Sequence, residues 1–530
     1  MNQQRLKLLS LSIILVFVVV VAKLFFFQVI SSYSLKSRNL SQMYKTEKIL
    51  PSRGEIKDYN NFPLATNINL YKLAIYKPNL TDDLVNVFNK INTVKPNFII
   101  DNQNSINQFT ANQNQLWYVF ATPFTDLEKK QIDIDGISFE KYQTRFYPEK
   151  EMAKPILSGL EKYYNKQLTG KTGFILASKD AIGNTLLSQK TWSIPHQNGF
   201  NLRTGIYKNI QFFTEKILKE GIEKYQADSG SIIIMNSQTG KIISMASFES
   251  TPSAKNIAIG NLFEPGSIFK PLVMTMALDN QSIKPDFICA KCDRDRNIGS
   301  DIITNWDEKH HPDSNLKDII INSDNIGMSY IIDELGEKKF LEYFQKLGLS
   351  QKSGIDLQGE AKPYPKTYWS HIDLAAASFG QGFALTQIKF LQVFNTIALD
   401  GKMIDPKIVQ YLESDNEKIQ IKNRPPINIF NEKATKEMKN ILKYAVENGP
   451  LSSLKDKNME VCAKSGTAQV AIGGKYNENS AIASYVGFSP CDKPKFTMIV
   501  TINNPKTAIW GSQTAAPIWY EIARYLYNLL

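Results

Sequence analysis

A serine and a lysine three residues apart are the first pair in this sequence that could carry chemistry. Ser267 and Lys270 follow a Pro-Gly dipeptide, and the apolar run that continues to Leu278 predicts a helix that begins there. Residues i and i+3 share one face of a helix, so Lys270 can lie beside Ser267. A serine hydroxyl is a weak nucleophile until a base takes its proton, and a lysine whose pKa is lowered can be that base.

The Ser-x-x-Lys spacing is not unique to this position. Ser314 and Lys317 have the same spacing, as do Ser452 and Lys455, and an ordinary helix start would explain any of the three. A helix N-terminus does offer free backbone N–H groups to a developing oxyanion. The first pair is distinguished by two motifs that follow it in the chain.

The second motif is Ser323-Asp324-Asn325, in a polar break between apolar helical pieces, and the third is Lys464-Ser465-Gly466-Thr467, at the end of an expected strand. A positive charge on Lys464 would help to keep Lys270 neutral. Ser323 could relay a proton, and Asn325 could bind a substrate amide. These types in this order therefore indicate attack by an activated serine on a carbonyl group.

The third motif also suggests how a substrate is held. The hydroxyls of Ser465 and Thr467 could bind a terminal carboxylate, and Gly466 could let a substrate backbone lie against the strand. The backbone N–H groups of Ser267 and Thr467 could form an oxyanion hole, in which one donor is typically worth ~3 kcal/mol.

Composition limits the other possibilities. The chain has 530 residues, 43% of them hydrophobic, which suggests two or more domains with packed cores. The formal charge is +11, but basic residues alternate with acidic ones. This pattern predicts a lysine-rich surface rather than nucleic-acid binding. A basic surface would also suit work near anionic lipid or cell-wall polymer.

Four cysteines are present, and two of them form a single C-x-x-C at Cys289 and Cys292. His310 and His311 follow, but they are adjacent, whereas zinc fingers space their histidines by several residues. We therefore expect a local disulfide or two free thiols here rather than a zinc site, and we expect no metal in the functional site.

The first residues predict a membrane anchor. Leu8 to Ile30 is apolar and long enough to span a bilayer, and Lys23 near its far end can reach the interface. No small-x-small cleavage site follows, which favours an uncleaved anchor over a signal peptide. Arg5 and Lys7 before the span predict a cytoplasmic N-terminus with the rest of the chain outside.

The later part of the chain predicts one sheet built from both ends of a domain. A helix is expected over 209–225 and two strands over 230–235 and 242–246, followed by helical segments over 316–347 that break near Ser323. Further strands are expected over 459–463, 482–488 and 496–502, with a closing helix over 514–530. The part before this domain is expected to be α+β with long loops.

Together the three motifs resemble those of penicillin-binding proteins and class A β-lactamases. Other segments also resemble class B penicillin-binding proteins, which are membrane-anchored peptidoglycan D,D-transpeptidases. They are Arg53 to Ile56 with Asp58, Leu64-Ala65, Arg145 to Pro148, Gly159 to Asn165, Glu264 to Pro271, Ser323 to Met328, Ser378 to Gly382 and Lys464 to Gln469.

The resemblance implies an α+β chain with an anchor over 1–30, a non-catalytic pedestal or dimerisation domain over 31–205, and a transpeptidase domain over 206–530. The last would have a β-lactamase-like fold, with a central antiparallel sheet flanked by helices. The sequence departs from the family's pattern at residues 202–205 and at Asn60-Asn61, where a glycine is common in the family. These departures affect the expectations for local loops. The pedestal region is too short for a glycosyltransferase domain.

The implied activity is the cross-linking of stem peptides that end in D-Ala-D-Ala, through a serine acyl-enzyme that releases the terminal D-Ala. No cofactor is implied. The implied partners are the membrane, β-lactams as inhibitors, a polytopic glycosyltransferase and other division proteins, but not nucleic acid. The implied location is the cell membrane, crossed once, with the catalytic domain outside.

Several alternatives stay open at this stage. A β-lactamase or a β-lactam sensor shares the three motifs, but the first would not need a large outer domain and the second would need more membrane spans. A non-catalytic scaffold should have damaged motifs. Within the family, Ser378 to Gly382 and Trp369 to Ala375 favour the septal type over the elongation type.

Overall fold

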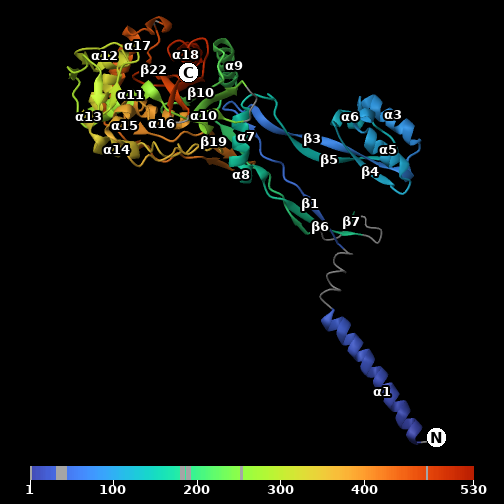
Figure 1. The fold of residues 1–530 in the computed structure, drawn as a ribbon. Helices are drawn as coiled ribbons and strands as arrows, with labels where there is room; N and C mark the ends of the chain where they lie inside the picture. Colours follow the sequence, from blue (N-terminus) through green and yellow to red (C-terminus); the bar gives the residue numbers. More distant parts are fainter. Residues whose placement is uncertain are drawn as a thin grey trace. The chain divides into compact units, whose positions relative to one another are not determined.

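The computed structural model describes residues 3–31, 44–179, 185–186, 192–250, 255–456, 458–472 and 475–529. The chain divides into two compact units (Figure 1). One comprises residues 1–54 and 169–199, and the other comprises residues 55–168 and 200–530. Each unit therefore combines two segments that are separated in the sequence.

The first unit begins with one long apolar helix, α1 (Gln3–Phe25), which continues as the π-helical turn η1 (Phe26–Ile30). Residues Leu8–Ile30 are long and apolar enough to cross a membrane, and none of the residues in the most apolar stretch is buried against the rest of the described chain. The expected N-terminal apolar helix is therefore confirmed.

The rest of the first unit is a small antiparallel sheet. Its central strand β6 (Gly173–Lys179) pairs with β1 (Tyr44–Ile49), β7 (Thr185–Leu186) and β8 (Trp192–Ile194). The register places Tyr44 opposite Ser178 and Ile49 opposite Gly173.

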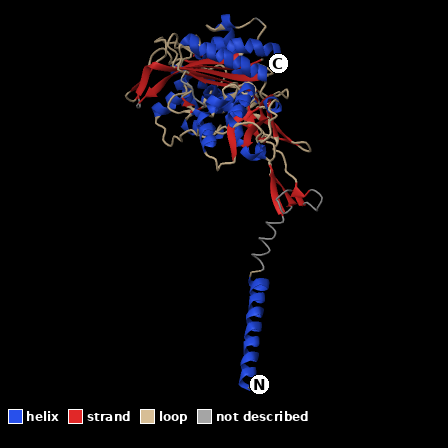
Figure 2. Ribbon diagram, turned by 90° about the vertical axis from the view of Figure 1, so that its right-hand side faces the viewer, coloured by secondary structure: helices blue, strands red, loops and turns tan. Residues whose placement is uncertain are grey.

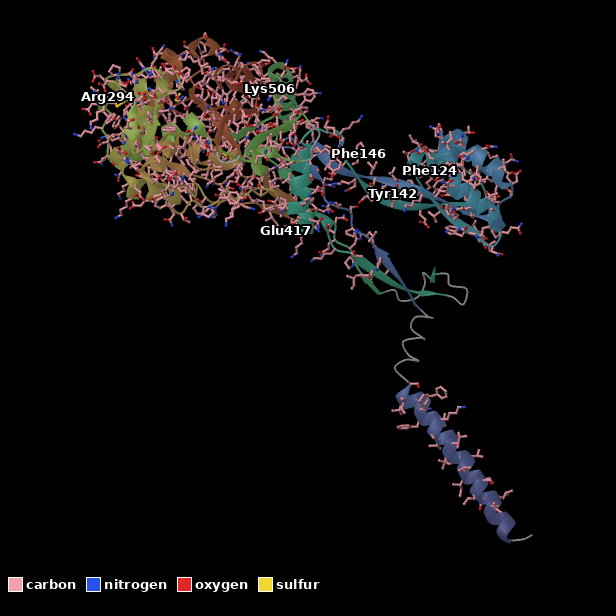
Figure 3. The ribbon with its side chains drawn as sticks, viewed as in Figure 1. Phe124, Tyr142, Phe146, Arg294, Glu417 and Lys506 are labelled. Carbon is pink, nitrogen blue, oxygen red and sulfur yellow. A yellow bond between two sulfur atoms is a disulfide. The ribbon has the colours of Figure 1, made fainter. Side chains whose placement is uncertain are left out.

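In the second unit, a long strand carries an aromatic core. The strand β3 (Pro63–Tyr76) pairs antiparallel with β4 (Trp117–Phe124) and β5 (Ile137–Phe146). Helices α3 (Leu84–Val94), α4 (Phe98–Asp101), α5 (Gln103–Ala111) and α6 (Asp126–Lys130) accompany them. Phe98 packs against Phe120 and Phe124, and Phe124 is labelled in Figure 3. This part is α+β, as expected.

Short strands connect this region with later parts of the chain. The strand β2 (Ile56–Lys57) pairs with β3 and with β9 (Asn201–Thr204), and β9 pairs with β19 (Val409–Glu413), which in turn pairs with β20 (Lys418–Gln420). Helices α7 (Lys154–Tyr163) and α8 (Asn165–Thr169) follow β5. Strands from early and late parts of the chain thus form one sheet.

A five-stranded antiparallel sheet is the centre of the C-terminal region, in the order β11-β10-β24-β23-β22 (Figure 2). Its strands are β10 (Ser229–Asn236), β11 (Ile242–Glu249), β22 (Cys462–Ile472), β23 (Lys475–Ser489) and β24 (Phe496–Asn503). The predicted sheet made from both ends of the domain is confirmed, and β22 is one of its edges.

Helices cover both faces of this sheet because successive side chains of a strand point to opposite faces. Ile232 and Ile234 pack in one core cluster with α9 (Lys208–Tyr225) and α18 (Ala515–Leu529). Ile233 and Met235 pack in the other cluster, with α11 (Lys270–Asp279) and α16 (Gln387–Ala398). The fold expected from the resemblance is confirmed.

The remaining elements of this region are mostly helices and short strand pairs. They are α10 (Ile257–Gly260), β12 (Leu262–Phe263), η3 (Gly266–Phe269), β13 (Ile288–Cys289), β14 (Arg296–Ile298), β15 (Asp301–Ile303), β16 (Ser314–Asn315), α12 (Leu316–Ile321), α13 (Asn325–Leu335), α14 (Glu337–Lys346), α15 (His371–Ser378), β17 (Leu385–Thr386), β18 (Lys402–Met403), β21 (Ile427–Asn428), α17 (Glu432–Asn448) and η4 (Ser452–Leu454). The expected break near Ser323 lies between α12 and α13.

One expected strand is wrong in its bounds. The apolar pattern predicts a strand over 459–463 that ends before the third motif, but β22 begins at Cys462 and runs through the motif to Ile472. Pairing with β23 extends the strand, with Lys464 opposite Val486 and Thr467 opposite Ala483. Lys464 to Thr467 therefore lie within the strand, where backbone pairing with β23 rather than an apolar side-chain pattern determines their conformation.

All four cysteines are paired. Cys289 is bonded to Cys292, and Cys462 is bonded to Cys491, with Cα–Cα distances of 5.5 Å in both pairs. Of the two alternatives for the C-x-x-C, a disulfide is therefore the one seen, and its sulfurs are not available as zinc ligands.

Candidate active site

The serine of the first motif lies on a tight turn that begins with Gly266. This glycine has a φ of 59°, in the region that favours glycine, and its N–H donates to the carbonyl oxygen of Gly380 over 2.9 Å. A Cβ at Gly380 would lie 2.2 Å from the oxygen of Gly266. The segment Ser378 to Gly382 thus packs directly against the turn that carries Ser267.

Lys270 is fully buried at the start of α11. Its Nζ donates to the carbonyl oxygen of Ser323, to Ser323 Oγ at 3.1 Å and to Asn325 Oδ1 at 2.7 Å. The first two motifs are therefore in direct contact. The hydroxyl of Ser267 has no hydrogen-bond partner among the described residues and faces the pocket, of which Ser267 is a lining residue.

The turn between α12 and α13 is held in an unusual conformation. Ser323 has a φ of 54°, a left-handed conformation that costs a non-glycine residue energy and persists where neighbouring contacts impose it. The N–H of Asp324 donates to the Ile319 carbonyl over 2.9 Å. Asn305 Oδ1 accepts the Asn325 N–H over 2.7 Å. These bonds fix the two side chains that face Lys270.

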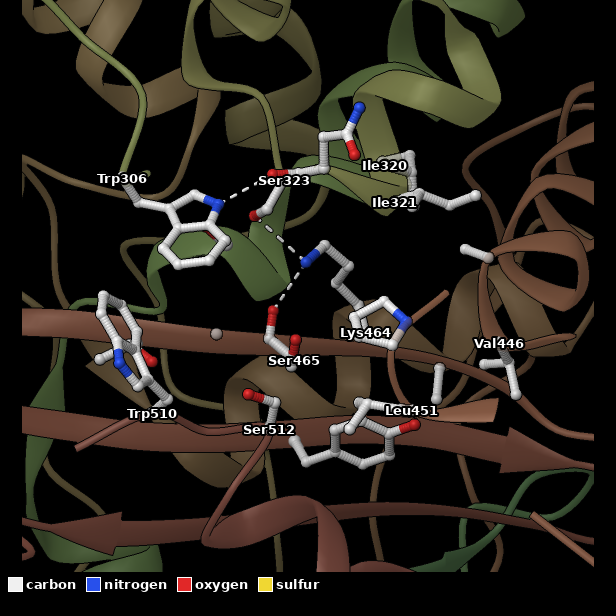
Figure 4. A pocket seen from close by; sticks show the side chains of 18 of the residues that line it. Trp306, Ile320, Ile321, Ser323, Val446, Leu451, Lys464, Ser465, Trp510 and Ser512 are labelled. Carbon is white, nitrogen blue, oxygen red and sulfur yellow. Dashed lines mark hydrogen bonds between the residues drawn. The ribbon is translucent and has the colours of Figure 1, made fainter. Parts of the chain in front are cut away.

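Lys464 contacts the same serine from β22. It is 6% exposed, and its Nζ donates to Ser323 Oγ over 3.2 Å and to the Ser465 carbonyl over 2.9 Å (Figure 4). Ser323 Oγ therefore contacts the side-chain nitrogens of both lysines. A hydroxyl has two acceptor lone pairs and one proton, so it can contact both lysines and still donate.

The two lysines differ in the causes of their lowered pKa values. Burial lowers the pKa of Lys270 well below its usual value, the positive charge of Lys464 lowers it further, and the carboxylate of Asp324 raises it. Burial alone lowers the pKa of Lys464 to about 8. Both lysines therefore lose their protons more readily than an exposed lysine does.

The other residues of the third motif pack closely. A Cβ at Gly466 would lie 2.9 Å from Ile268 Cγ2 and 3.1 Å from Ile268 N, so a glycine lets β22 approach the turn of Ser267. This is a different reason for the glycine from the expected contact with a substrate backbone. Thr467 Oγ1 accepts the Gly511 N–H over 3.0 Å, and its own proton remains available.

These residues surround a cavity of about 320 Å³. Six of the expected site residues line it, whereas Lys270 and Asn325 are not among its lining residues. The six are Ser267, Ser323, Lys464, Ser465, Gly466 and Thr467. The two Ser-x-x-Lys alternatives, at Ser314 and Ser452, do not line this cavity in the described part of the chain.

Sequence reasoning missed the apolar walls of the cavity. Trp306 and Trp510 lie edge to face with their ring centres 5.0 Å apart, and Trp306 Nε1 donates to the Asn322 carbonyl over 2.8 Å. Ile320 and Val446 lie among the labelled side chains on the other side of Lys464 (Figure 4). A tryptophan in a polar stretch was a usable signal for Trp306, but the aliphatic residues carry no such signal.

Two family descriptions match the chain. "Penicillin binding protein transpeptidase domain" matches residues 230–524, and "Penicillin-binding Protein dimerisation domain" matches residues 48–158. The first covers more than half of the chain and contains all three motifs.

Similar curated proteins match over nearly the whole chain. Stage V sporulation protein D of Bacillus subtilis is 26% identical over 98% of this chain and 85% of its own length. Peptidoglycan D,D-transpeptidase FtsI of Buchnera aphidicola subsp. Baizongia pistaciae is 25% identical over 99% of this chain and 95% of its own length.

Solved structures share the fold at lower identity. Penicillin Binding Protein 2X from Streptococcus thermophilus has a TM-score of 0.76 and 21% identity, covering 91% of this chain and 80% of that one. A peptidoglycan synthetase from Bifidobacterium adolescentis has a TM-score of 0.73 and 21% identity, covering 92% and 96%.

Proposed function

Because this chain belongs to the class B penicillin-binding proteins, we propose that it cross-links peptidoglycan stem peptides through an acyl-enzyme on Ser267. The chain is a peptidoglycan D,D-transpeptidase of that family. What remains to be assigned is which residues perform each step, on which substrate, and where in the cell.

Acylation begins with proton transfer from the Ser267 hydroxyl to the neutral amine of Lys270. Ser267 Oγ then attacks the carbonyl carbon of the penultimate D-Ala, and the backbone N–H groups of Ser267 and Thr467 stabilise the resulting oxyanion. The support for Lys270 as the base is its complete burial beside a second cation, since both lower its pKa.

Departure of the terminal D-Ala requires a proton on its nitrogen. Ser323 gives its hydroxyl proton to this nitrogen and takes one from the ammonium of Lys270, which returns Lys270 to its neutral form. The observation that carries this step is the position of Ser323 Oγ, 3.1 Å from Lys270 Nζ and 3.2 Å from Lys464 Nζ. The acceptor amine of a second stem peptide then attacks the acyl carbon, and Lys270 takes a proton from this amine. The bond between the acyl carbon and Ser267 Oγ breaks, and Lys270 returns the proton to Ser267 Oγ.

Substrate contacts are assigned to the strand and to one amide. Ser465, Thr467 and the charge of Lys464 hold the terminal carboxylate, Gly466 keeps β22 close to Ser267, and Asn325 binds a substrate amide. Asn325 now contacts Lys270, and its Nδ2 donates to the Thr304 carbonyl over 3.0 Å. One N–H of Nδ2 and one lone pair of Oδ1 remain available, so the side chain can bind a substrate amide while it keeps these contacts.

The experiment that tests this function is the reaction with a depsipeptide that ends in D-Ala-D-lactate, in the presence of a D-amino acid acceptor. Formation of a new amide bond, which Ser267→Ala abolishes, is expected. Rapid turnover of a chromogenic β-lactam would instead favour a β-lactamase, and absence of any reaction with either compound would favour a non-catalytic scaffold.

We further propose that α1 crosses the membrane once, with the N-terminus in the cytoplasm and the catalytic region outside. Arg5 and Lys7 lie at the start of α1, before its apolar segment Leu8–Ile30, as the positive-inside rule requires. The two disulfides also fit an oxidising compartment. External protease on spheroplasts should digest all but a small N-terminal fragment, whereas a fully protected catalytic region would contradict the orientation.

A role in septal wall synthesis is proposed from Ser378 to Gly382 and Trp369 to Ala375, with a polytopic glycosyltransferase and division proteins as partners. The domain boundaries at 30/31 and 205/206 are proposals too. Depletion should produce filamentous cells and the protein should gather at division sites. Rounded cells with a dispersed signal would favour the elongation type.

A further inference from the structure

Asp324, the middle residue of the second motif, lies fully buried between the two residues that contact Lys270. Its Oδ1 accepts the N–H of Gly327 over 2.9 Å and so caps α13. Its Oδ2 is buried and has no hydrogen-bond partner among the described residues. A helix cap requires only one acceptor oxygen, so the cap does not account for a charged carboxylate at this position.

A buried carboxylate with one free oxygen is costly unless a nearby charge compensates it. The carboxylate of Asp324 acts on the amine of Lys270, whose pKa it raises. Ser323 and Asn325, on either side of Asp324 in the chain, both contact Lys270 Nζ, and neither carries a charge. Among the described residues, the acidic group that acts on the buried amine is thus Asp324, on the backbone segment that positions the amine's hydrogen-bond partners.

We infer that Asp324 is the counter-charge that stabilises Lys270 in its protonated form, after Lys270 has taken the proton of Ser267. Asp324 touches neither the substrate nor the reacting atoms, so it is a positioning residue that acts through Lys270. The inference rests on the proposed function, in which Lys270 is the base.

The charged groups around Lys270 act in opposite directions. Lys464 on β22 lowers the pKa of Lys270, and Asp324 at the start of α13 raises it. Without Lys464, the amine would hold its proton too firmly to act as a base. Without Asp324, it would be too weak a base to take a proton from a hydroxyl. Lys464 and Asp324 together keep the pKa of Lys270 between these two limits.

The test is the substitution Asp324→Asn in the full chain, because asparagine caps a helix as well as aspartate does and removes only the charge. The rate of acylation by a fluorescent penicillin is measured against pH. The acid limb of the profile, where Lys270 gains its proton, should move to lower pH by about one unit. Asp324→Ser, a second uncharged cap, should move it in the same direction.

The matched control is Asp318→Asn, which removes a carboxylate from the capping box of the neighbouring helix α12. Asp318 is not among the groups that act on Lys270, so the limb should stay in place. If Asp324→Asn lowers the melting temperature or the plateau rate but leaves the limb where it is in the wild type, the role of Asp324 is structural and the inference is wrong.

The same experiment separates this inference from the proposed function. If Lys270→Arg reacts with penicillin as fast as the wild type does, Lys270 is not the base and the proposed mechanism fails. If Lys270→Arg is inactive while the acid limb of Asp324→Asn lies at the same pH as in the wild type, the proposed mechanism stands. Only the role of Asp324 as a counter-charge is then refuted.

Discussion

One wall of the catalytic cavity is a strand, and the opposite wall is a turn between two helices. Lys464 to Thr467 lie within β22, whose register against β23 fixes each residue through a backbone ladder. Ser323, by contrast, lies in a left-handed conformation between α12 and α13. The strand can present its groups with little local strain, whereas the turn must be held by its neighbours.

The walls also differ in how they act on Lys270. The strand wall contributes a cation, Lys464, whose own pKa is lowered to about 8 by burial. The helical wall contributes the uncharged contacts of Ser323 and Asn325 together with the carboxylate of Asp324. We therefore expect the strand wall to hold the substrate and the helical wall to adjust the pKa of the base, Lys270.

The largest effect on acylation is expected from a substitution of Lys270, because groups from both walls act on this residue. Lys270→Arg keeps a positive charge but removes the base, because a guanidinium does not lose its proton near neutral pH. Acylation by penicillin should fall by roughly a thousandfold, within the range that general bases supply. Circular dichroism should show an unchanged fold, and wild-type rates in the variant would exclude Lys270 as the base.

A smaller loss is expected when the strand wall is pushed away from Ser267. Gly466→Ala places a Cβ against Ile268, including its backbone nitrogen, which cannot move without moving the turn. Acylation should slow by roughly a hundredfold, since a displacement of ~1 Å has that cost. Gly260→Ala is the control, because its Cβ would first meet the flexible Lys255 side chain at 3.1 Å. Equal rates in both variants would show that the close approach is unimportant.

Removing the cation of the strand wall should shift the pH profile rather than abolish the reaction. In Lys464→Ala the pKa of Lys270 rises, so Lys270 stays protonated to higher pH and the acid limb of the acylation rate moves upward. Lys464→Arg keeps the cation, and its limb should stay near that of the wild type, with a loss mainly in geometry. A downward shift in Lys464→Ala would contradict the account.

The smallest effect on acylation is expected from the two disulfides, one of which includes Cys462 of β22. Cys462–Cys491 encloses a longer loop than Cys289–Cys292, with sequence separations of 29 and 3. Replacing the first pair by serines should cost about 3.5 kcal/mol of unfolding free energy, and replacing the second about 2 kcal/mol. Denaturant melts would measure this, while acylation per folded molecule should not change. The opposite order of stabilities would count against the loop-entropy argument.

Sequence and structure agree on the sheet and the motifs for physical reasons. A short continuous apolar run predicts β10, which is buried on both faces, and helical spacing of apolar residues predicts α9. The bounds of β22 were not predictable in this way. Its motif is polar and glycine-containing, and its strand conformation comes from long-range pairing with β23.

The residues of the cavity likewise divide into those that the sequence predicts and those that it does not. The order of the three motifs was sufficient to predict that Lys270, Ser323, Asn325 and Lys464 belong together, and the structure brings them into contact. No sequence pattern indicates that Trp510 contacts Trp306 at one side of the cavity, since the two residues are far apart in the chain. The left-handed φ at Ser323 is likewise a result of tertiary contacts.

The most direct test of the central claim is to map the acylated residue. The full-length protein is reacted with penicillin, its intact mass is measured, and the labelled peptide is sequenced by fragmentation. One adduct per chain is expected, on Ser267, and none in Ser267→Ala. Label on Ser314 or Ser452, or an unchanged adduct in Ser267→Ala, would contradict that claim.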